Sequence, residues 1–313
     1  MLTRRHIRIK VMQSAYSFSH RENSKLEDEL KFFEASVAQS FDLYFSLLGL
    51  IKSLMDFTSE QLKTYEELGS QKIKYQHLKT FSENKVLQLI QHHPILEKKL
   101  NSKKAIKCDL EFVFLKELLD KITSEDMFVD YQKKSKHTWD DDLKWFEKCF
   151  KNHIATSDYL YDYLEDQNIT WIDDLPLVNT FFSKILKQLR SDQAEQLPFP
   201  EFIKSGEDFQ FGRELLEKTL SNDKKLELEL EGKTPNWEAD RIAILDRVIL
   251  KIAITELLYF PNIPAKVTLN EYLEIAKDYS TPNSNTFVNG VLDKLVREFK
   301  EENRMNKSGR GLL

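Results

Sequence analysis

Apolar residues recur every three or four positions through the first two thirds of the chain. Between Leu26 and Met55 they follow steps of three and four residues, which predicts one amphipathic helix of about eight turns. Three further segments share this spacing: residues 110–122, 143–154 and 182–189. The pattern therefore predicts that residues 26–190 form a stack of amphipathic helices.

The C-terminal part shows the clearest helix signals. Residues 242–259 are apolar on nearly every side, which is typical of a helix at the centre of a bundle. Pro261 and Pro264 end this helix and open the next element. Thr268 and Glu271 match a capping box, so we expect the next helix to begin with Thr268 as its N-cap.

A final helix is predicted to start at Asn283 or Ser284, because either residue can serve as its N-cap. Gly290 lies inside this helix, where glycine costs about 1 kcal/mol of helix propensity. We expect a close contact with a neighbouring helix to explain this glycine. At the other end of the chain, the pattern predicts an amphipathic helix over residues 3–18.

Two segments are less regular. Residues 226–231 alternate Leu and Glu, which formally fits a strand. Leu226 and Leu230 are also four residues apart, and Gly232 is a typical helix stop, so we prefer a helix. Residues 191–205 contain two prolines and are the best candidate for a linker.

The composition supports this picture. The 313 residues include only 8 Gly and 8 Pro, which argues against sandwiches, barrels and glycine-rich nucleotide loops. The sequence therefore predicts an all-α fold. It has no apolar run long enough to span a membrane and no apolar signal core, so we expect a cytoplasmic protein without a membrane partner. Cys108 and Cys149, without a C-x-x-C pair, fit two free thiols in a reducing compartment.

No catalytic or cofactor motif is present. The chain lacks the P-loop, dinucleotide-binding, zinc-protease and nucleophile-elbow patterns. His137 with the acids at 140–142 is the best metal-like cluster, but a helix capped by Thr138 explains it better. Asn270 and Glu271 resemble an amide–acid pair, which the capping box explains without catalysis. We expect no enzyme activity, no catalytic residue, no metal site and no cofactor.

Charge is concentrated at both ends of the chain. The formal net charge is −5, yet residues 1–21 carry +5 and residues 294–313 carry +3, which leaves −13 for residues 22–293. Clustered Arg and Lys can neutralise phosphates and release counterions. The alternative is a basic face that is merely solvated.

Residues 3–18 carry side chains that suit nucleic acid. Arg4, Arg5 and Arg8 supply bidentate donors at a helix N-terminus, which itself attracts anions. Tyr16 offers a ring on which an unpaired base can stack, a contact worth about 1–3 kcal/mol. The other interpretation is that Tyr16 belongs to the core and exposes only its hydroxyl.

Several fragments carry a family resemblance. In chain order they are Arg4-Arg-His-Ile-Arg8 with Gln13 and Tyr16, Phe211-Gly-Arg-Glu-Leu-Leu216 with Trp237, Asp246-Arg-Val-Ile-Leu-Lys-Ile-Ala-Ile-Thr-Glu-Leu-Leu258, Pro264-Ala-Lys-Val-Thr-Leu-Asn-Glu271 and Phe287-Val-Asn-Gly-Val-Leu-Asp-Lys294. Their identity and order resemble the bacterial transcription antitermination factor NusB. The resemblance covers about 20 N-terminal and about 105 C-terminal residues.

The resemblance implies an all-α fold of two small helical bundles, with a further bundle inserted in this chain. Family members of ordinary length are about half as long as these 313 residues. We therefore predict a NusB-like RNA-binding domain from residues 1–24 and 201–313. Residues 25–200 are predicted to be an inserted helical region, to which no motif gives a function.

The resemblance also implies a function in transcription and a set of partners. It implies binding of boxA-type single-stranded RNA jointly with a small-subunit ribosomal protein that acts as NusE. The complex is expected to join the elongating RNA polymerase and to support antitermination and ribosomal RNA transcription.

By position, the RNA-facing residues of the family fall on Arg4, Arg5, His6, Arg8, Tyr16, Tyr279, Asn283 and Phe287. His6 replaces a more basic residue, which weakens one contact at neutral pH. Tyr279 replaces a common Phe and keeps a stacking ring, whereas Asn283 replaces a common acid and removes a negative charge near phosphate. Phe287 belongs either to this face or to the core. Lys251 stands where an Arg is usual.

Two other functions stay open. The protein could be an interaction scaffold without RNA binding, or an accessory part of an enzyme that modifies ribosomal RNA. The enzyme would need a glycine-rich loop and a nucleophilic cysteine, and the 8 glycines of the chain argue against it. If the protein binds RNA, about four cationic contacts with a single strand predict a slope of about −3 when the logarithm of the binding constant is plotted against the logarithm of the salt concentration.

Overall fold

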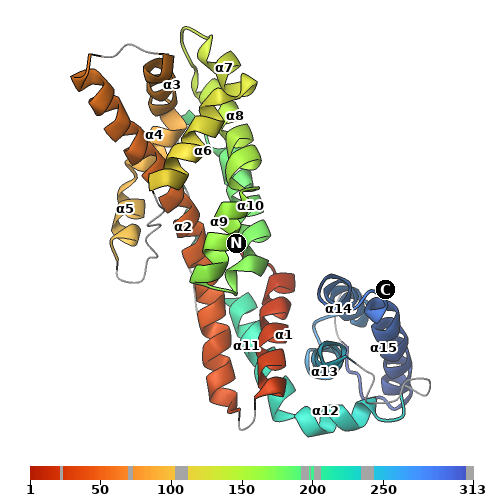
Figure 1. Ribbon diagram of the computed structural model, residues 1–313. Helices are drawn as coiled ribbons and strands as arrows, with labels where there is room; N and C mark the ends of the chain where they lie inside the picture. Colours follow the sequence, from red (N-terminus) through yellow and green to blue (C-terminus); the bar gives the residue numbers. More distant parts are fainter. Residues whose placement is uncertain are drawn as a thin grey trace. The chain divides into compact units, whose positions relative to one another are not determined.

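The computed structural model describes residues 1–21, 24–69, 73–102, 112–191, 197, 199–200, 206–233 and 243–307. Every regular element among these residues is a helix, so the all-α prediction is confirmed (Figure 1). The chain forms two compact units. We call residues 2–37 with 202–313 the split unit, and residues 38–201, together with Met1, the middle unit.

The split unit joins the two ends of the sequence. It consists of α1 (Arg4–His20), the start of α2 (Leu26–Glu67), α11 (Glu207–Ser221), α12 (Asp223–Leu230), α13 (Ile244–Tyr259), α14 (Ala265–Tyr279) and α15 (Ser284–Glu301). Helix α13 packs against α1, α11, α12, α14 and α15. Its Ile249, Ile252 and Ala253 are fully buried, so the prediction of a central apolar helix is confirmed.

A glycine allows three helices of the split unit to approach closely. A Cβ atom at Gly212 of α11 would lie 2.3 Å from Cγ2 of Ile7 on α1 and 2.6 Å from Cζ of Phe33 on α2. The Phe33 ring also stacks on Phe209 of α11, with centroids 5.6 Å apart. Only glycine leaves room for both neighbours here.

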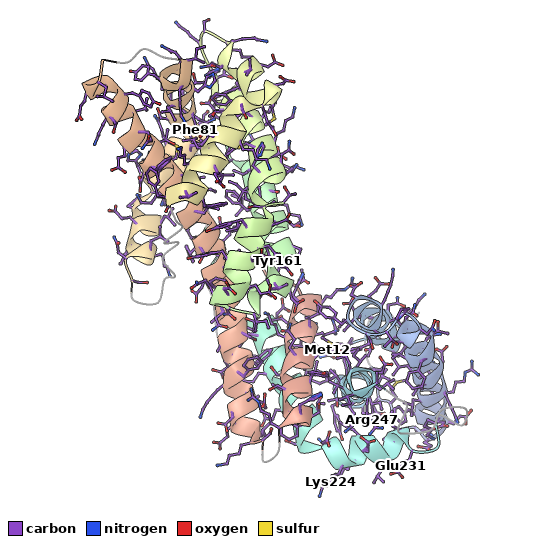
Figure 2. The ribbon with its side chains drawn as sticks, in the orientation of Figure 1. Met12, Phe81, Tyr161, Lys224, Glu231 and Arg247 are labelled. Atoms are coloured by element: carbon purple, nitrogen blue, oxygen red, sulfur yellow. The ribbon has the colours of Figure 1, made fainter. Side chains whose placement is uncertain are left out.

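The middle unit contains the rest of α2 and the helices that follow it. These are α3 (Ile73–Ser82), α4 (Lys85–Gln91), α5 (Pro94–Leu100), α6 (Phe112–Ser124), α7 (Asp126–Gln132), α8 (Trp139–Cys149), a π-helix over Phe150–Ile154, α9 (Asp158–Gln167) and α10 (Trp171–Gln188). Aromatic rings fill its core: Phe81, labelled in Figure 2, and Phe128 both meet Trp145 edge-on. Such pairs add about 0.5–1.5 kcal/mol each beyond burial.

A buried polar cluster links α4, α7 and α8 in the middle unit. The Tyr131 hydroxyl donates to Oδ1 of Asp142 at 2.7 Å, and Asn84 Nδ2 donates to that hydroxyl at 3.2 Å. The backbone N–H of Lys85 donates to Oδ2 of Asp142 at 3.0 Å. Both carboxylate oxygens of the buried Asp142 therefore have donors, as a buried charge requires.

Several helix predictions are confirmed. Residues 226–231 are helical as far as Leu230, and Gly232 takes a φ of +70° just beyond the helix end. Thr138 caps α8: its Oγ1 accepts from the Asp141 N–H at 3.2 Å. Helix α2 is longer than predicted, because its apolar spacing continues past Met55 and no glycine or proline lies between Met55 and Gly69.

The predicted capping box at Thr268 is wrong. Helix α14 begins at Ala265, directly after Pro264, so Thr268 lies inside the helix. Thr268 is buried and donates its hydroxyl to Glu256, and Glu271 pairs with Arg5. The proline starts the helix one turn early, and tertiary partners take both side chains of the expected box.

The expected contact at Gly290 is also wrong. A Cβ atom there would meet nothing within 4 Å, so this glycine does not allow a close helix approach. Asn283 does occupy the N-cap position of α15, but its side chain makes no capping hydrogen bond. Ser284 instead donates its hydroxyl to Asp246 at 2.7 Å.

The compact units divide at residues 37/38, later in the chain than the predicted domain boundary at 24/25. Phe33 explains the difference, because the first turns of α2 pack on α1 and α11. Most of the linker candidate 191–205 lies outside the described residues, as do Cys108 and Trp237. The assignment of an RNA-binding domain and an inserted region stays a prediction.

Candidate nucleic-acid interface

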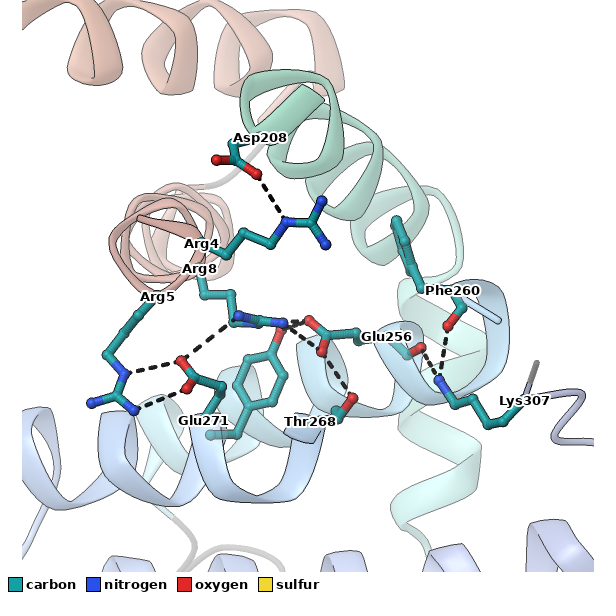
Figure 3. A network of polar contacts seen from close by, with 10 residues as sticks. Arg4, Arg5, Arg8, Asp208, Glu256, Phe260, Thr268, Glu271 and Lys307 are labelled. Atoms are coloured by element: carbon teal, nitrogen blue, oxygen red, sulfur yellow. Dashed lines mark hydrogen bonds and ion pairs between the residues drawn. The ribbon is translucent and has the colours of Figure 1, made fainter. Parts of the chain in front are cut away.

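The first turn of α1 is held by carboxylates from distant parts of the sequence (Figure 3). Arg4 Nε donates to Oδ1 of Asp208 on α11 at 2.8 Å. Arg5 donates through Nε and Nη2 to both carboxylate oxygens of Glu271 on α14, each at 2.9 Å. These two arginines are therefore not an isolated charge run.

Arg8 forms the innermost of these pairs. Its Nε and Nη2 donate to the two oxygens of Glu256 on α13 at 2.8 and 2.9 Å. Glu256 also accepts hydroxyl hydrogen bonds from Thr268 at 2.8 Å and Tyr272 at 3.0 Å. The side chains of Arg8 and Glu256 are 3% and 0% exposed. This pair joins α1 to α13 and α14 inside the fold.

Arg8 was predicted to face RNA, and its burial removes it from the surface on which a strand can lie. Its guanidinium instead fixes the position of the first turn of α1. Burial disfavours the charge of Arg8, but the hydrogen bond to Glu256 and the negative charges of Glu256 and Glu271 together outweigh burial and raise the pKa of Arg8.

Arg4 and Arg5 remain accessible. Their side chains are 48% and 42% exposed. A guanidinium has five N–H donors, of which Arg4 gives one to Asp208 and Arg5 gives two to Glu271. The hydrogen bond with Arg5 holds the pKa of Glu271 below its usual range. Both arginines therefore keep N–H donors that can reach a phosphate.

These two arginines border a hollow of about 630 Å³. His6 lines the hollow from α1, and Asn262, Pro264 and Val267 line it from the start of α14 and the preceding turn. His6 Nδ1 accepts from the Thr3 N–H at 3.3 Å. Burial, followed by the charge of Arg5, lowers the pKa of His6, so the ring is neutral at pH 7.

The other predicted residues lie toward the opposite end of α13. Asp246, in the first turn of α13, accepts hydroxyl hydrogen bonds from Ser280 at 2.6 Å and Ser284 at 2.7 Å. These bonds fix the turn between α14 and α15, which carries the exposed Asn283. Tyr279 and Phe287 flank this turn and are half-buried.

Tyr16 lies near the same end of α13. Its neighbours Ala15 and Ser19 line a hollow together with Ile244 and Arg247 of the first turn of α13. The Tyr16 ring is 40% exposed and packs on His20, with ring centroids 4.1 Å apart. An exposed ring fits the stacking interpretation better than the core interpretation.

The structure therefore divides the eight predicted residues into two groups. Arg4, Arg5, His6 and Arg8 lie where α13 ends, whereas Tyr16, Tyr279, Asn283 and Phe287 lie where α13 begins. Asp246 and Glu256 mark these two ends, and ten residues of helix separate them by about 15 Å. All eight residues belong to the split unit.

The acids that pair with the arginines, Asp208, Glu256 and Glu271, were not among the predicted site residues. The sequence does contain one sign of such a pair, because Glu256 is a carboxylate within the apolar segment 242–259. A buried carboxylate needs a cation or several donors. Lys251 is paired as well: its Nζ lies 2.7 Å from Asp223 and 2.7 Å from Glu227.

Two other observations concern membrane spans and the cysteine at 149. No helix in the described ranges is long and apolar enough to cross a bilayer. Cys149 is buried, and burial raises the pKa of its thiol, as expected for an inert cysteine.

Comparison with known proteins decides the family. The model of the NusB family matches residues 178–297. The transcription antitermination protein NusB of Geotalea daltonii is 35% identical over 126 residues, which are 40% of this chain and 84% of that protein. The chain belongs to the NusB family. The resemblance inferred from the fragments is thereby confirmed.

Two further NusB relatives match a shorter stretch. NusB of Salinibacter ruber is 46% identical over 103 residues, which are 33% of this chain and 64% of that protein. NusB of Chloroherpeton thalassium is 42% identical over 106 residues, or 34% of this chain and 49% of that protein. The chain thus spans less than two thirds of either relative. No solved structure matches the chain.

Proposed function

We propose that this NusB-family protein is a non-enzymatic transcription antitermination factor that binds boxA-type single-stranded RNA through its split unit. The observation that carries the proposal is the pair of exposed guanidiniums, Arg4 and Arg5, beside an open hollow. Both keep N–H donors for phosphate after their bonds to Asp208 and Glu271. The relatives named as antitermination proteins support the proposal.

The proposed RNA strand runs over the surface of α1 and α14, in the direction of the buried α13. Arg4 and Arg5, with a neutral His6 beside them, contact phosphates and sugars at one end. Tyr16 and Tyr279 offer rings for unpaired bases at the other end, near Asn283 and Phe287. The two ends of α13 that the groups border are about 15 Å apart, and a strand that advances about 3.4 Å per nucleotide needs at least about five nucleotides to span this length.

The proposed partners follow from the family. They are a small-subunit ribosomal protein that acts as NusE, and the RNA polymerase elongation complex in the cytoplasm, where ribosomal RNA is transcribed. The protein partner is proposed to share the RNA with the split unit. The middle unit, residues 38–201, receives no role in this proposal.

A length series of boxA-type RNA tests the proposal. Fluorescence anisotropy should show that strands of three nucleotides bind weakly and that affinity rises steeply once the strand exceeds about five. The purified NusE-type ribosomal protein should increase the affinity further. Absence of binding by a 12-nucleotide strand, with and without that protein, would leave the interaction scaffold as the better function.

A further inference from the structure

A second hollow lies in the split unit where the end of α1, the junction of α11 and α12, and the first turns of α13 meet. Its volume is about 470 Å³, within the range of pockets that hold small molecules. It is separate from the arginine-lined hollow, which lies near the other end of α13.

The floor of this hollow is apolar. Leu220 and Val248 are almost fully buried beneath it, and Phe18 adds an aromatic ring from α1. Ile244 is 51% exposed, although it lines the same hollow. An apolar surface of this kind favours a flat aromatic group over a charged one.

One wall carries four charged side chains. Lys251 Nζ lies 2.7 Å from Asp223 Oδ1 and 2.7 Å from Glu227 Oε2, and Arg247 Nη1 lies 3.4 Å from Glu227 Oε1. Figure 2 labels Arg247 on α13, which packs on α12. Two cations balance two carboxylates, so this wall offers hydrogen-bond acceptors without a net charge that would repel a phosphate backbone.

The hollow borders the end of α1 that carries Tyr16 of the proposed RNA site. Ala15 and Ser19 of α1 line it, and Tyr16, which is proposed to stack on a base, lies between them in the sequence. The Ser19 hydroxyl donates to the Tyr16 carbonyl at 2.7 Å. A strand that stacks on Tyr16 can therefore turn its next base into the hollow.

We infer that this hollow holds one unpaired base of the RNA and that Asp223 selects a base with an exocyclic amino group. The inference rests on the proposed function. Among the described residues, Lys251 bonds to Oδ1 of Asp223, and Oδ2 accepts no hydrogen bond. A carboxylate only accepts hydrogen bonds, so it pairs with the exocyclic amino groups of adenine, cytosine or guanine. Uracil has no amino group, and the two carbonyl oxygens beside its single N–H donor repel a carboxylate.

Abasic scanning of a boxA-type RNA tests the base pocket. Each nucleotide is replaced in turn by an abasic one, and affinity is measured by fluorescence anisotropy. For the unmodified protein, we expect one position next to the Tyr16-stacked base at which removal weakens binding about 10-fold. Ser19→Leu narrows the pocket from the exposed end of α1, so the effect at this position should shrink to about 2-fold or less.

Base substitution at that position tests the role of Asp223. We expect the unmodified protein to bind uridine about 10-fold more weakly than adenosine, cytidine or guanosine. Asp223→Asn replaces one acceptor by a donor and should remove most of this difference. Glu229→Gln is the matched control on α12, because Glu229 pairs with Arg304 and does not line the pocket. Circular dichroism confirms that each variant is folded.

The possible results distinguish a failure of the base pocket from a failure of the proposed function. RNA binding with the same abasic profile in the unmodified protein and in Ser19→Leu would overturn the base pocket and leave the proposed function intact. So would an unchanged base preference in Asp223→Asn. Absence of RNA binding by the unmodified protein would overturn the proposed function, and with it this inference.

Discussion

The two compact units bury their charged groups differently. In the split unit, Arg8 and Glu256 are fully buried partners separated by 248 positions in the sequence. In the middle unit, the buried Asp142 is satisfied by the Tyr131 hydroxyl and a backbone N–H. The split unit therefore depends on an ion pair between its two chain segments, whereas the middle unit uses neutral donors inside a continuous segment.

This difference explains why Arg4, Arg5 and Arg8 do not all act at the surface. The ends of the chain must find each other to form the split unit, and a bidentate ion pair fixes both register and orientation. We interpret Arg8 as the residue that fixes this register, and Arg4 and Arg5 as the residues left for a ligand.

The largest effect is expected for Glu256→Gln. The substitution removes the carboxylate that binds Arg8 through two hydrogen bonds and leaves only Glu271, 3.7 Å from Arg8 Nη1. Loss of this buried partner should lower the free energy of unfolding by about 3–5 kcal/mol. Urea denaturation measures the change, and Glu274→Gln on the exposed side of α14 is the control. If both variants lose the same small amount, the ion pair does not hold the split unit together.

Two glycine substitutions should change the stability of the protein in opposite directions. Gly212→Ala should destabilise the protein by about 1–3 kcal/mol, because its Cβ would lie 2.3 Å from Ile7 and 2.6 Å from Phe33. Gly290→Ala meets nothing within 4 Å and should stabilise the protein by up to about 1 kcal/mol through helix propensity. Thermal unfolding of both variants distinguishes them, and a loss of stability in Gly290→Ala would contradict the packing described for α15.

In the middle unit, Tyr131→Phe should cost about 1–3 kcal/mol, because one oxygen of the buried Asp142 loses its donor. Tyr161→Phe is the control, since Tyr161 is 39% exposed. Denaturation followed by hydrogen exchange locates the effect. An effect confined to α1 and α13 would show that the polar cluster does not stabilise the middle unit.

The smallest effect concerns pH. The pKa of His6 is lowered in the folded protein, so the unfolded chain binds more protons as pH falls below the ordinary value of about 6.5. Stability should therefore decrease between pH 7.5 and pH 5.5. Glu271 stays charged in this range, because its pKa is below its usual value. His6→Gln should reduce the pH dependence, and an identical dependence in both proteins would refute the role of His6.

The helices were predictable because their apolar spacing is regular. The central position of α13 followed from an apolar surface on every side, and α12 followed from Leu226 and Leu230 four residues apart. The start of α14 was not predictable from Thr268 and Glu271, because their partners Glu256 and Arg5 come from other helices. Capping rules consider only residues close in the sequence, so they miss partners that come from other helices.

The candidate site was predictable only in part. The family resemblance indicated Arg4, Arg5 and Tyr16, and the structure leaves all three exposed to different degrees. Charge counting could not separate them from Arg8, because it does not show which arginine meets a buried carboxylate. The hollow beside Phe18 could not be predicted at all, since three separate segments form it.

The central claim is that Arg4 and Arg5 contact RNA. The double variant Arg4→Gln with Arg5→Gln is a better test than substitution by Glu. A glutamate at position 5 would place a second carboxylate beside Glu271, and the repulsion would disturb the fold. Titration of a 12-nucleotide boxA-type RNA at several salt concentrations is the most direct test. Lys133→Gln with Lys134→Gln, two exposed cations of the middle unit, is the matched control.

The account predicts that the arginine variant binds RNA more weakly and that its log–log salt slope is less negative by about 1.4, or about 0.7 for each lost phosphate contact. The lysine control should retain the affinity and slope of the unmodified protein. Equal affinity and equal slope in the arginine variant and the unmodified protein would contradict the proposed RNA contact at the start of α1.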